Sequence, residues 1–250
     1  MQYQARQGLN IRGLSDDKID RVWRTISKDY FSRFSVEDSI WHTLAISSCR
    51  QEEMPLVLLR PQTHRGGAEI FIYVDDRAGT FAICTATLDQ LGLNILDARI
   101  ITTNEDLALI SFHVLEDNGS PIPDLTREQS IVNVLRANLI APDQSVLSVD
   151  RHRPRQSQHF NIKTTISFKS DYQKRYTILE IRTQDQPGVL STIGQCFSAC
   201  KVNVRNAKIT TLGSTAEDIF YITDSDNKMI EDSEIIDQLK ESLIEKLTSS

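Results

Sequence analysis

The 250-residue sequence predicts an α+β protein with two ferredoxin-like units, each a four-stranded antiparallel sheet with two helices, preceded by a short helical segment. An internal repeat is the first reason, because Asp76-Arg-Ala-Gly79 aligns with Asp185-Gln-Pro-Gly188 at an offset of 109 positions. The second reason is that segments typical of strands and helices follow in the same order in both copies. The length also suits two domains of ordinary size.

The repeat continues beyond this motif at the same offset. The further matched pairs are Asn94 and Asn203, Ala98 and Ala207, Ile100 and Ile209, and Thr102 and Thr211. Between the Asp-x-x-Gly motif and the asparagine of each copy, apolar residues recur at the spacing of one buried helix face. They are Phe81, Cys84, Leu88 and Leu91 in the first copy and Leu190, Ile193, Phe197 and Cys200 in the second.

Each copy is expected to run strand, helix, strand, strand, helix. The predicted ranges are 69–75, 79–91, a strand from Asn94, 107–115 and 124–139, and then 176–184, 188–200, a strand from Asn203, 217–223 and 231–247. Polar turns join the two middle strands, which is typical of an antiparallel hairpin. The fourth strand of the ferredoxin-like plan is missing from this order.

We expect the missing strand ahead of each copy, in residues 55–60 and 162–168, paired antiparallel with the strand that follows and at the sheet edge. For the first copy, residues 145–149 are an alternative. The predicted organisation is a helical segment in 1–52, the first unit in 53–150, a linker in 151–160 and the second unit in 161–250. The linker contains a basic stretch, 151–155, read as solvated linker or as a contact for an anion or a partner.

Two helices are expected in the first 50 residues. Ser15 or Asp16 would cap one that carries Ile19, Val22, Trp23, Ile26 and Tyr30 on one face. Ser35 and Asp38 have the Ser-x-x-Asp spacing of a helix start before the other. His42 on this second helix is expected to pack in a core and not to bind a ligand.

Composition excludes several classes of function. The net charge of −6 argues against a nucleic-acid binder, including an RNA binder on a ferredoxin-like sheet. No apolar run is long enough to cross a membrane, so the cytoplasm is the expected compartment. The four cysteines have neither zinc-site spacing nor the density of a disulfide framework, and we expect free thiols.

The Asp-x-x-Gly corner offers two opposite chemistries. The carboxylate of Asp76 or Asp185 accepts hydrogen bonds from an ammonium group, and the free N–H groups of the helix's first turn donate to a carboxylate. An α-amino acid presents both charges on one carbon, and Gly79 or Gly188 permits its close approach. The alternative is a helix cap without a ligand, which aspartate also favours.

Both copies resemble the ACT domain, a ferredoxin-like regulatory module that binds amino acids and pairs side by side. The resemblance lies in the segments "DRAGTFAICTATLDQLGLNILDARI" and "DQPGVLSTIGQCFSACKVNVRNAKI". Together with "DYFSRFSVEDSIWHT" and "AEDIFYITD", they are similar to the C-terminal half of the bifunctional uridylyltransferase/uridylyl-removing enzymes, over about residues 15–250. The resemblance implies a regulatory region that binds L-glutamine to switch between uridylylation and deuridylylation of the PII signal protein.

The resemblance also implies the ligand contacts, namely the ammonium on the aspartates, the carboxylate on N–H groups near the glycines, and backbone contacts from the opposite strand. The implied ligand-binding residues are Asp76, Ala78, Gly79, Asn94, Ile95 and Asp97 in the first copy, and Asp185, Pro187, Gly188, Asn203, Val204 and Asn206 in the second. The copies differ at Ala78 and Pro187 and at Asp97 and Asn206, so one site is a candidate for having lost its ligand. The alternative function is a module that docks PII or forms a homodimer.

No catalytic residue is expected here. The sequence has neither the Gly-Ser motif with paired aspartates of a nucleotidyltransferase nor the His-Asp dipeptide of the hydrolase, and no Walker loop, GxSxG or HExxH motif. We therefore expect a non-catalytic fragment without cofactor or metal. Mg2+ and a hydrolase metal are expected only in catalytic domains beyond this sequence.

Overall fold

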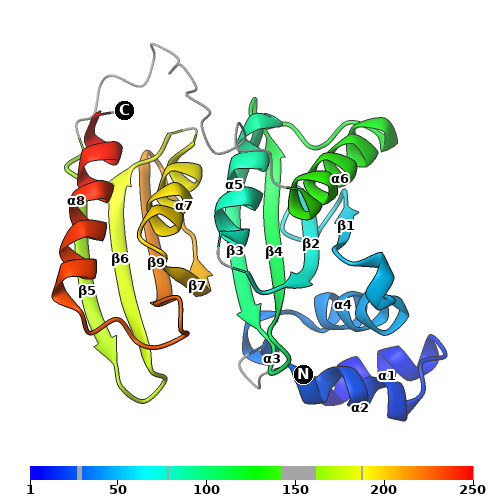
Figure 1. The fold of residues 1–250 in the computed structure, drawn as a ribbon. Helices are drawn as coiled ribbons and strands as arrows, with labels where there is room; N and C mark the ends of the chain where they lie inside the picture. The colour runs from blue at the N-terminus through cyan, green and yellow to red at the C-terminus, as the bar shows by residue number, and fades with distance from the viewer. Residues whose placement is uncertain (27–29, 78, 142–161, 187, 250) are drawn as a thin grey trace.

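The two repeats fold as two antiparallel sheets, each with a pair of helices on one face, and a helical segment lies against the first (Figure 1). This computed structural model describes residues 1–26, 30–77, 79–141, 162–186 and 188–249. The α+β prediction with two ferredoxin-like units is confirmed by the strand orders, β1-β2-β4-β3 in the first sheet and β5-β6-β9-β7 in the second, where the short β8 also pairs with β9.

The first copy follows the predicted order of elements closely. Its elements are β1 (Leu56–Arg60), β2 (Ala68–Asp75), α5 (Thr80–Gln90), β3 (Leu93–Thr102), β4 (Leu107–Glu116) and α6 (Leu125–Ile140). The prediction of an edge strand before the repeat is correct, because β1 pairs antiparallel with β2, Leu56 opposite Tyr73. The alternative strand at 145–149 and the basic stretch at 151–155 lie outside the described residues.

The second copy repeats this plan. Its elements are β5 (Thr165–Asp171), β6 (Tyr176–Gln184), α7 (Val189–Ala199), β7 (Asn203–Lys208), β8 (Thr211–Leu212), β9 (Thr215–Thr223) and α8 (Ser233–Ser249). Strand β5 takes the predicted edge position beside β6. Both copies have a β-bulge at the same place, with the register shifting at Leu96 in β3 and at Arg205 in β7.

The N-terminal segment contains more helices than predicted. They are α1 (Gln2–Ile11), α2 (Asp16–Thr25), α3 (Tyr30–Arg33), α4 (Val36–Ser48) and the 3-10 turn η1 (Gln51–Glu53). The sequence analysis missed α1 and placed Tyr30 in the same helix as Ile19, whereas α2 ends at Thr25. The predicted start at Ser35 is confirmed, since Ser35 and Asp38 form a reciprocal capping box.

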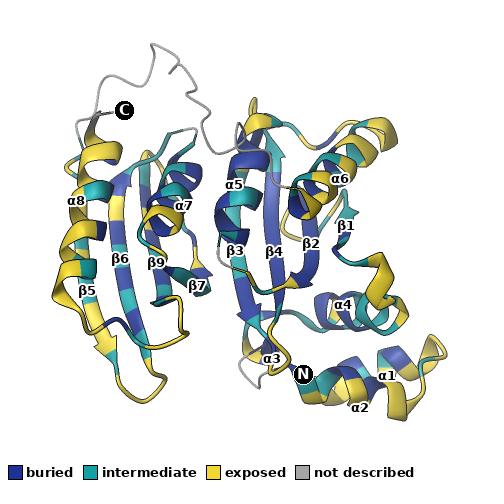
Figure 2. Ribbon diagram, viewed as in Figure 1, coloured by how far each residue is buried: buried dark blue, intermediate teal, exposed yellow. Residues whose placement is uncertain are grey.

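The central strands of the first sheet, β2 and β4, are buried along most of their length (Figure 2), and the helical segment packs against the face that α5 and α6 leave free. Phe71, Tyr73 and Leu109 on this face are buried in one cluster with Tyr30 and Phe34 of the segment. Arg99 on β3 also contacts the segment, because it donates to the carbonyl of Arg33 at 2.5 Å and lies over the Phe34 ring.

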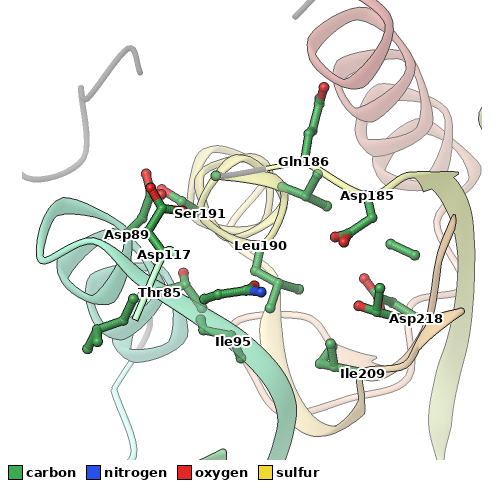
Figure 3. A pocket seen from close by; sticks show the side chains of 16 residues that line it. Thr85, Asp89, Ile95, Asp117, Asp185, Gln186, Leu190, Ser191, Ile209 and Asp218 are labelled. Atoms are coloured by element: carbon green, nitrogen blue, oxygen red, sulfur yellow. The ribbon is translucent and has the colours of Figure 1, made fainter. Parts of the chain in front are cut away.

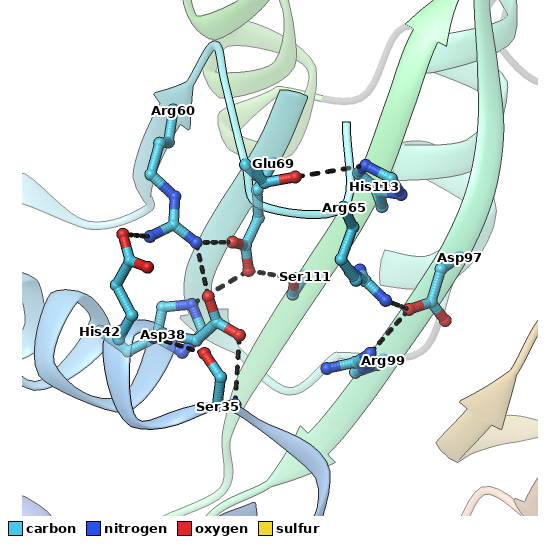
Figure 4. Close-up of polar contacts among 12 residues, drawn as sticks. Ser35, Asp38, His42, Arg60, Arg65, Glu69, Asp97, Arg99, Ser111 and His113 are labelled. Carbon is cyan, nitrogen blue, oxygen red and sulfur yellow. Dashed lines mark hydrogen bonds and ion pairs between the residues drawn. The ribbon is translucent and has the colours of Figure 1, made fainter. Parts of the chain in front are cut away.

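A buried polar network fastens this segment to the first sheet (Figure 4). Glu69 on β2 accepts from Ser111 at 2.6 Å and from Arg60 at 2.5 Å, and Arg60 also contacts Asp38 of α4. His42 is buried between Tyr30, 2.8 Å from its Nδ1, and Glu69, 3.3 Å from its Nε2. Although burial acts to raise it, these partners hold the pKa of Glu69 below its usual range. The expectation that His42 packs in a core is confirmed.

Candidate functional site

The two copies contact each other through α5 and α7 and through the edge strands β3 and β7. A Cβ on Gly194 would stand 2.8 Å from the Cα of Ala82, so a glycine is needed for this close helix contact. The apolar side chains of both copies form one continuous core, in which Phe81 lies 6.3 Å from Phe197 between ring centroids. Each Asp-x-x-Gly corner therefore faces the other copy.

The glycines of the two corners have the same conformation. Gly79 and Gly188 stand immediately before α5 and α7 with φ of +85° and +81°, a left-handed conformation that favours glycine. The N-cap residues of α5 and α7 are Gly79 and Gly188 themselves, so neither aspartate, three residues earlier, occupies the N-cap position. The conformation of these glycines does not distinguish the two corners. Their surroundings do.

The corner of the second copy borders an open cavity of about 250 Å3 (Figure 3). Asp185, Gln186 and the first turn of α7 form one wall, and Leu93, Asn94 and Ile95 of β3 form the opposite wall. This volume is several times the roughly 30 Å3 that one water occupies, so the space suits a small molecule. It is built at the junction of the two copies and is complete only when both are present.

Two carboxylates of the second copy face each other at one end of this cavity. Asp185 lies at the end of β6, and Asp218 on β9 is 2 % exposed and accepts from the backbone N–H of Thr210 at 3.3 Å. Burial raises the pKa of Asp185, and burial together with the nearby Asp185 carboxylate raises the pKa of Asp218 to about 7. This end of the cavity would be stabilised by a cation.

Two further carboxylates, both from the first copy, line the other end. These are Asp89 on α5 and Asp117 in the turn after β4, and Figure 3 shows them on the side away from Asp185 and Asp218. An oxygen of Asp89 lies 3.4 Å from the point where a Cβ on Gly188 would stand. None of the described lining residues is Lys, Arg or His.

The corner of the first copy is nearly closed, with a space of only about 20 Å3. Asp76 accepts from the guanidinium of Arg205 at 2.6 Å and from the hydroxyl of Thr102 at 3.0 Å. Arg205 is the bulge residue of β7 and belongs to the other copy, so this corner already holds a cation supplied by the protein itself. Burial nevertheless raises the pKa of Asp76, against the effect of Arg205.

The structure brings most of the predicted residues together, but across copies. Asp185 and Gly188 share their cavity with Asn94 and Ile95 of the first copy, and Asp76 and Gly79 share theirs with Asn203 and Val204 of the second. Asp97 and Asn206 are absent from the residues lining both spaces. Asp97 pairs with Arg65 at 2.7 Å and Arg99 at 3.0 Å, and Asn206 accepts from Arg33. Ala78 and Pro187 lie outside the described residues.

The sequence analysis missed Asp218, Asp89, Asp117 and Arg205. A signal was present for two of them. Asp218 is a charged residue in the apolar strand β9. It pairs with β6 as the buried Ile110 of β4 pairs with β2, so the two residues occupy equivalent positions. Arg205 of the second copy aligns with Leu96 of the first at the 109-residue offset of the repeat. In the described part of the chain, no group of three or more His, Cys, Asp or Glu residues is arranged to hold a metal, and no helix is long and apolar enough to cross a membrane.

Comparisons with known proteins agree on one group of relatives. Residues 1–45 match the family model described as "Uridylyltransferase GlnD fifth domain". The chain is 45 % identical over 228 residues to a bifunctional uridylyltransferase/uridylyl-removing enzyme of Methylococcus capsulatus, covering 91 % of this chain and 26 % of that enzyme. A protein of the same description from Stutzerimonas stutzeri is 39 % identical over 247 residues, covering 97 % and 27 %.

The chain thus spans about a quarter of the length of these curated relatives. Among solved structures, it is similar to an aspartate kinase from Synechocystis with a TM-score of 0.42 and 17 % identity, covering 72 % of this chain and 27 % of that one.

Proposed function

Since similarity over nearly its whole length relates this chain to a C-terminal part of the bifunctional uridylyltransferase/uridylyl-removing enzymes, we propose that it is a regulatory region that binds L-glutamine. The cavity at the second corner is the proposed binding site. The observation that carries this proposal is an open space between the copies with two carboxylates at one end and no basic residue among the described residues that line it. An amino acid would supply a cation there through its ammonium group.

The ammonium of the ligand would lie between Asp185 and Asp218. The methylene groups of a glutamine would then pass Leu190 and Ile95, whose apolar side chains form the middle of the cavity in Figure 3. The helix start at Gly188 is already next to the Asp89 carboxylate, so we assign the ligand's α-carboxylate to β3 instead. Strand β3 is at the edge of its sheet, where one side of the backbone has no ladder partner among the described strands.

These contacts suffice for a metabolite sensor. A dissociation constant between about 100 μM and 1 mM requires roughly 4 to 5.5 kcal/mol. Charge-assisted hydrogen bonds contribute about 1.5 to 3 kcal/mol each, against which the cost of association must be set. Because the ligand would touch both copies, its binding would favour one relative orientation of the pair. In the whole enzyme we propose that this orientation selects removal of uridylyl groups from PII over their addition.

Isothermal titration with each of the twenty amino acids tests the proposal. We expect heat of binding with L-glutamine and a dissociation constant in the range above. A flat glutamine titration on protein that is folded by circular dichroism would contradict it. Asp237→Asn provides a control variant, because it removes an exposed carboxylate from α8 that does not line the cavity. This variant should bind glutamine as the natural chain does.

One observation favours docking of PII as a second candidate function. The outer face of the second sheet carries the half-buried Ile178, Ile219 and Tyr221, and no described helix covers it as the N-terminal segment covers the first sheet. Size-exclusion chromatography of the chain with PII, with and without glutamine, separates the two functions. Co-elution that is insensitive to glutamine would support docking alone.

A further inference from the structure

We infer that the ammonium group of a ligand enters the cavity at the second corner in exchange for a proton. In the free protein the proton is bound to the carboxyl group of Asp218. It leaves for the solvent when the ammonium donates hydrogen bonds to Asp185 and Asp218. The inference rests on the proposed function, because it takes the ligand to be an amino acid, and it makes binding at that site depend on pH.

Two carboxylates face each other at a place that is shielded from water. Asp185 at the end of β6 and Asp218 on β9 lie at one end of the cavity (Figure 3), and Asp218 is only 2 % exposed. The one printed hydrogen bond to Asp218 comes from the backbone N–H of Thr210, at 3.3 Å, and is a weak compensation for a buried charge. Ionising both carboxylates is unfavourable in such a site, so one of them takes up a proton.

Asp218 is the member of the pair that takes up the proton. Its side chain is buried, whereas Asp185 is half-buried at the mouth of the cavity. Burial, together with the nearby Asp185 carboxylate, raises the pKa of Asp218 to about 7. About half of the free chains therefore carry this proton at pH 7, and an ammonium that binds between the two carboxylates displaces it.

The other charged groups around Asp218 do not compensate it with an ion pair among the described residues. Across the cavity, Asp89 and Asp117 are acidic, and the described first turn of α7 and the short β8 carry no charge. Asp218 also borders a groove on the outer side of the sheet. The charged residues of that groove are Arg182 and Glu217, which pair with each other at 3.2 Å, Glu180, which pairs with Lys169 at 2.7 Å, and the exposed Lys208.

The closed corner balances its carboxylate in a different way. Asp76 accepts from the guanidinium of Arg205 at 2.6 Å, and the position of Asp218 is taken there by the apolar Ile110. The closed corner thus has one carboxylate and a cation from the protein, whereas the open corner has two carboxylates and no described cation. In the open corner a proton on Asp218 reduces the negative charge until the ligand's ammonium replaces it.

The test is calorimetric titration of glutamine at pH 6 and pH 8. Each titration is run in phosphate and in a buffer with a larger enthalpy of ionisation, MES at pH 6 and HEPES at pH 8, because the difference in heat gives the number of protons released. With the pKa of Asp218 at about 7, we expect release of about 0.9 proton per glutamine at pH 6 and about 0.1 at pH 8. The apparent affinity should be up to about tenfold weaker at pH 6 than at pH 8.

Asp218→Asn keeps an oxygen that accepts from Thr210 and cannot take up a proton. It should bind glutamine at both pH values with the weak affinity that the natural chain has at pH 6, and with no proton release beyond that of the ligand itself. The control Asp237→Asn should behave as the natural chain does. Carboxyl-carbon NMR follows the same proton without a substitution. The Asp218 signal should titrate near pH 7 in the free chain and no longer between pH 6 and 8 with glutamine bound.

Glutamine binding without proton release at pH 6 would overturn the inference and leave the proposed function standing. Release that persists in Asp218→Asn, or an Asp218 signal that titrates below pH 5 in the free chain, would have the same consequence. Absence of binding by all twenty amino acids at both pH values would contradict the proposed function and the proton exchange together.

Discussion

The two Asp-x-x-Gly corners share the left-handed conformation of their glycines and differ in what lies opposite the aspartate. At the first corner, Arg205 lies 2.6 Å from Asp76 and leaves about 20 Å3. At the second, Asp185 faces a second carboxylate and a space of about 250 Å3. The motif alone therefore does not decide whether a corner can hold a ligand. In the first corner the protein supplies the cation itself, and in the second it leaves a place for one.

Two positions outside the motif account for this difference. The bulge residue is Arg205 in β7 and Leu96 in β3, so only one bulge provides a cation. The residue on the central strand is Asp218 in β9 and the buried Ile110 in β4, so only one corner has a second carboxylate. A duplicated domain can in this way keep one junction as a fixed contact and the other as a cavity.

The largest expected effect is on stability, at Asp218. Its pKa is about 7 in the folded state against an ordinary value of 3.8, so the fold holds the proton longer than the unfolded chain does. Stability therefore falls as pH rises from about 4 to 7, by up to about 4 kcal/mol from this group. Asp218→Ile introduces the residue type that the first copy has at this position, Ile110, and should remove this loss of stability at higher pH. Urea unfolding at pH 5 and pH 8 measures it, and an unchanged pH dependence in the variant would refute the assignment.

The next effect is expected at the closed corner. Arg205→Leu places the residue of the other bulge opposite Asp76 and leaves that carboxylate without its cation. We expect a loss of about 2 to 3 kcal/mol in the free energy of unfolding, the usual size for a charged group that loses its partner. Adding Asp76→Asn should recover most of the loss. A double variant as unstable as the sum of both single variants would show that the pair is not coupled.

Substituting the two aspartates compares the corners as binding sites. Asp185→Asn should weaken glutamine binding about 10- to 100-fold, because a charge-assisted hydrogen bond to the ammonium is replaced by a neutral one. Asp76→Asn should change the affinity less than about twofold, since its partner is Arg205. Calorimetry of both variants gives the comparison. Equal losses would indicate two equivalent sites.

The smallest effect is expected at the corner glycines. Gly79→Ala and Gly188→Ala each put a Cβ at positive φ and should cost about 1 kcal/mol of stability alike. Only Gly188→Ala should also reduce glutamine binding, because only its Cβ would stand at the open cavity. Thermal unfolding and calorimetry on the two variants separate the common strain from the specific loss. A binding defect in Gly79→Ala would argue that the first corner takes part.

The repeat made the fold predictable, because a strand, corner and helix that recur at one offset constrain each other. The edge strand β1 was predictable for the same reason. Helix α1 was missed because much of it is polar and exposed, with only Ala5 and Leu9 buried. The break after Thr25 was missed because the apolar spacing of Ile19 and Val22 continues into Tyr30, which the structure places in a separate turn.

The candidate site was predictable only as far as it is local. Asp185, Gly188 and the facing Asn94 followed from the motif and the repeat. The roles of Arg205 and Asp218 did not, because they depend on which side chain the neighbouring copy or strand brings to the corner. Two mismatches between the copies would have separated the corners, namely Arg205 at the position of Leu96 and Asp218 within a strand whose counterpart in the first copy, 107–110, is apolar.

The central claim is that only one of the two corners is open to an amino acid. The most direct measurement is the stoichiometry of glutamine binding to the chain, with a crystal structure of the complex to place the ligand. The asymmetry predicts one glutamine per chain, between Asp185 and the Asn94–Ile95 segment of β3, with Arg205 still on Asp76. Two glutamines per chain, or one at Asp76 with Arg205 displaced, would contradict it.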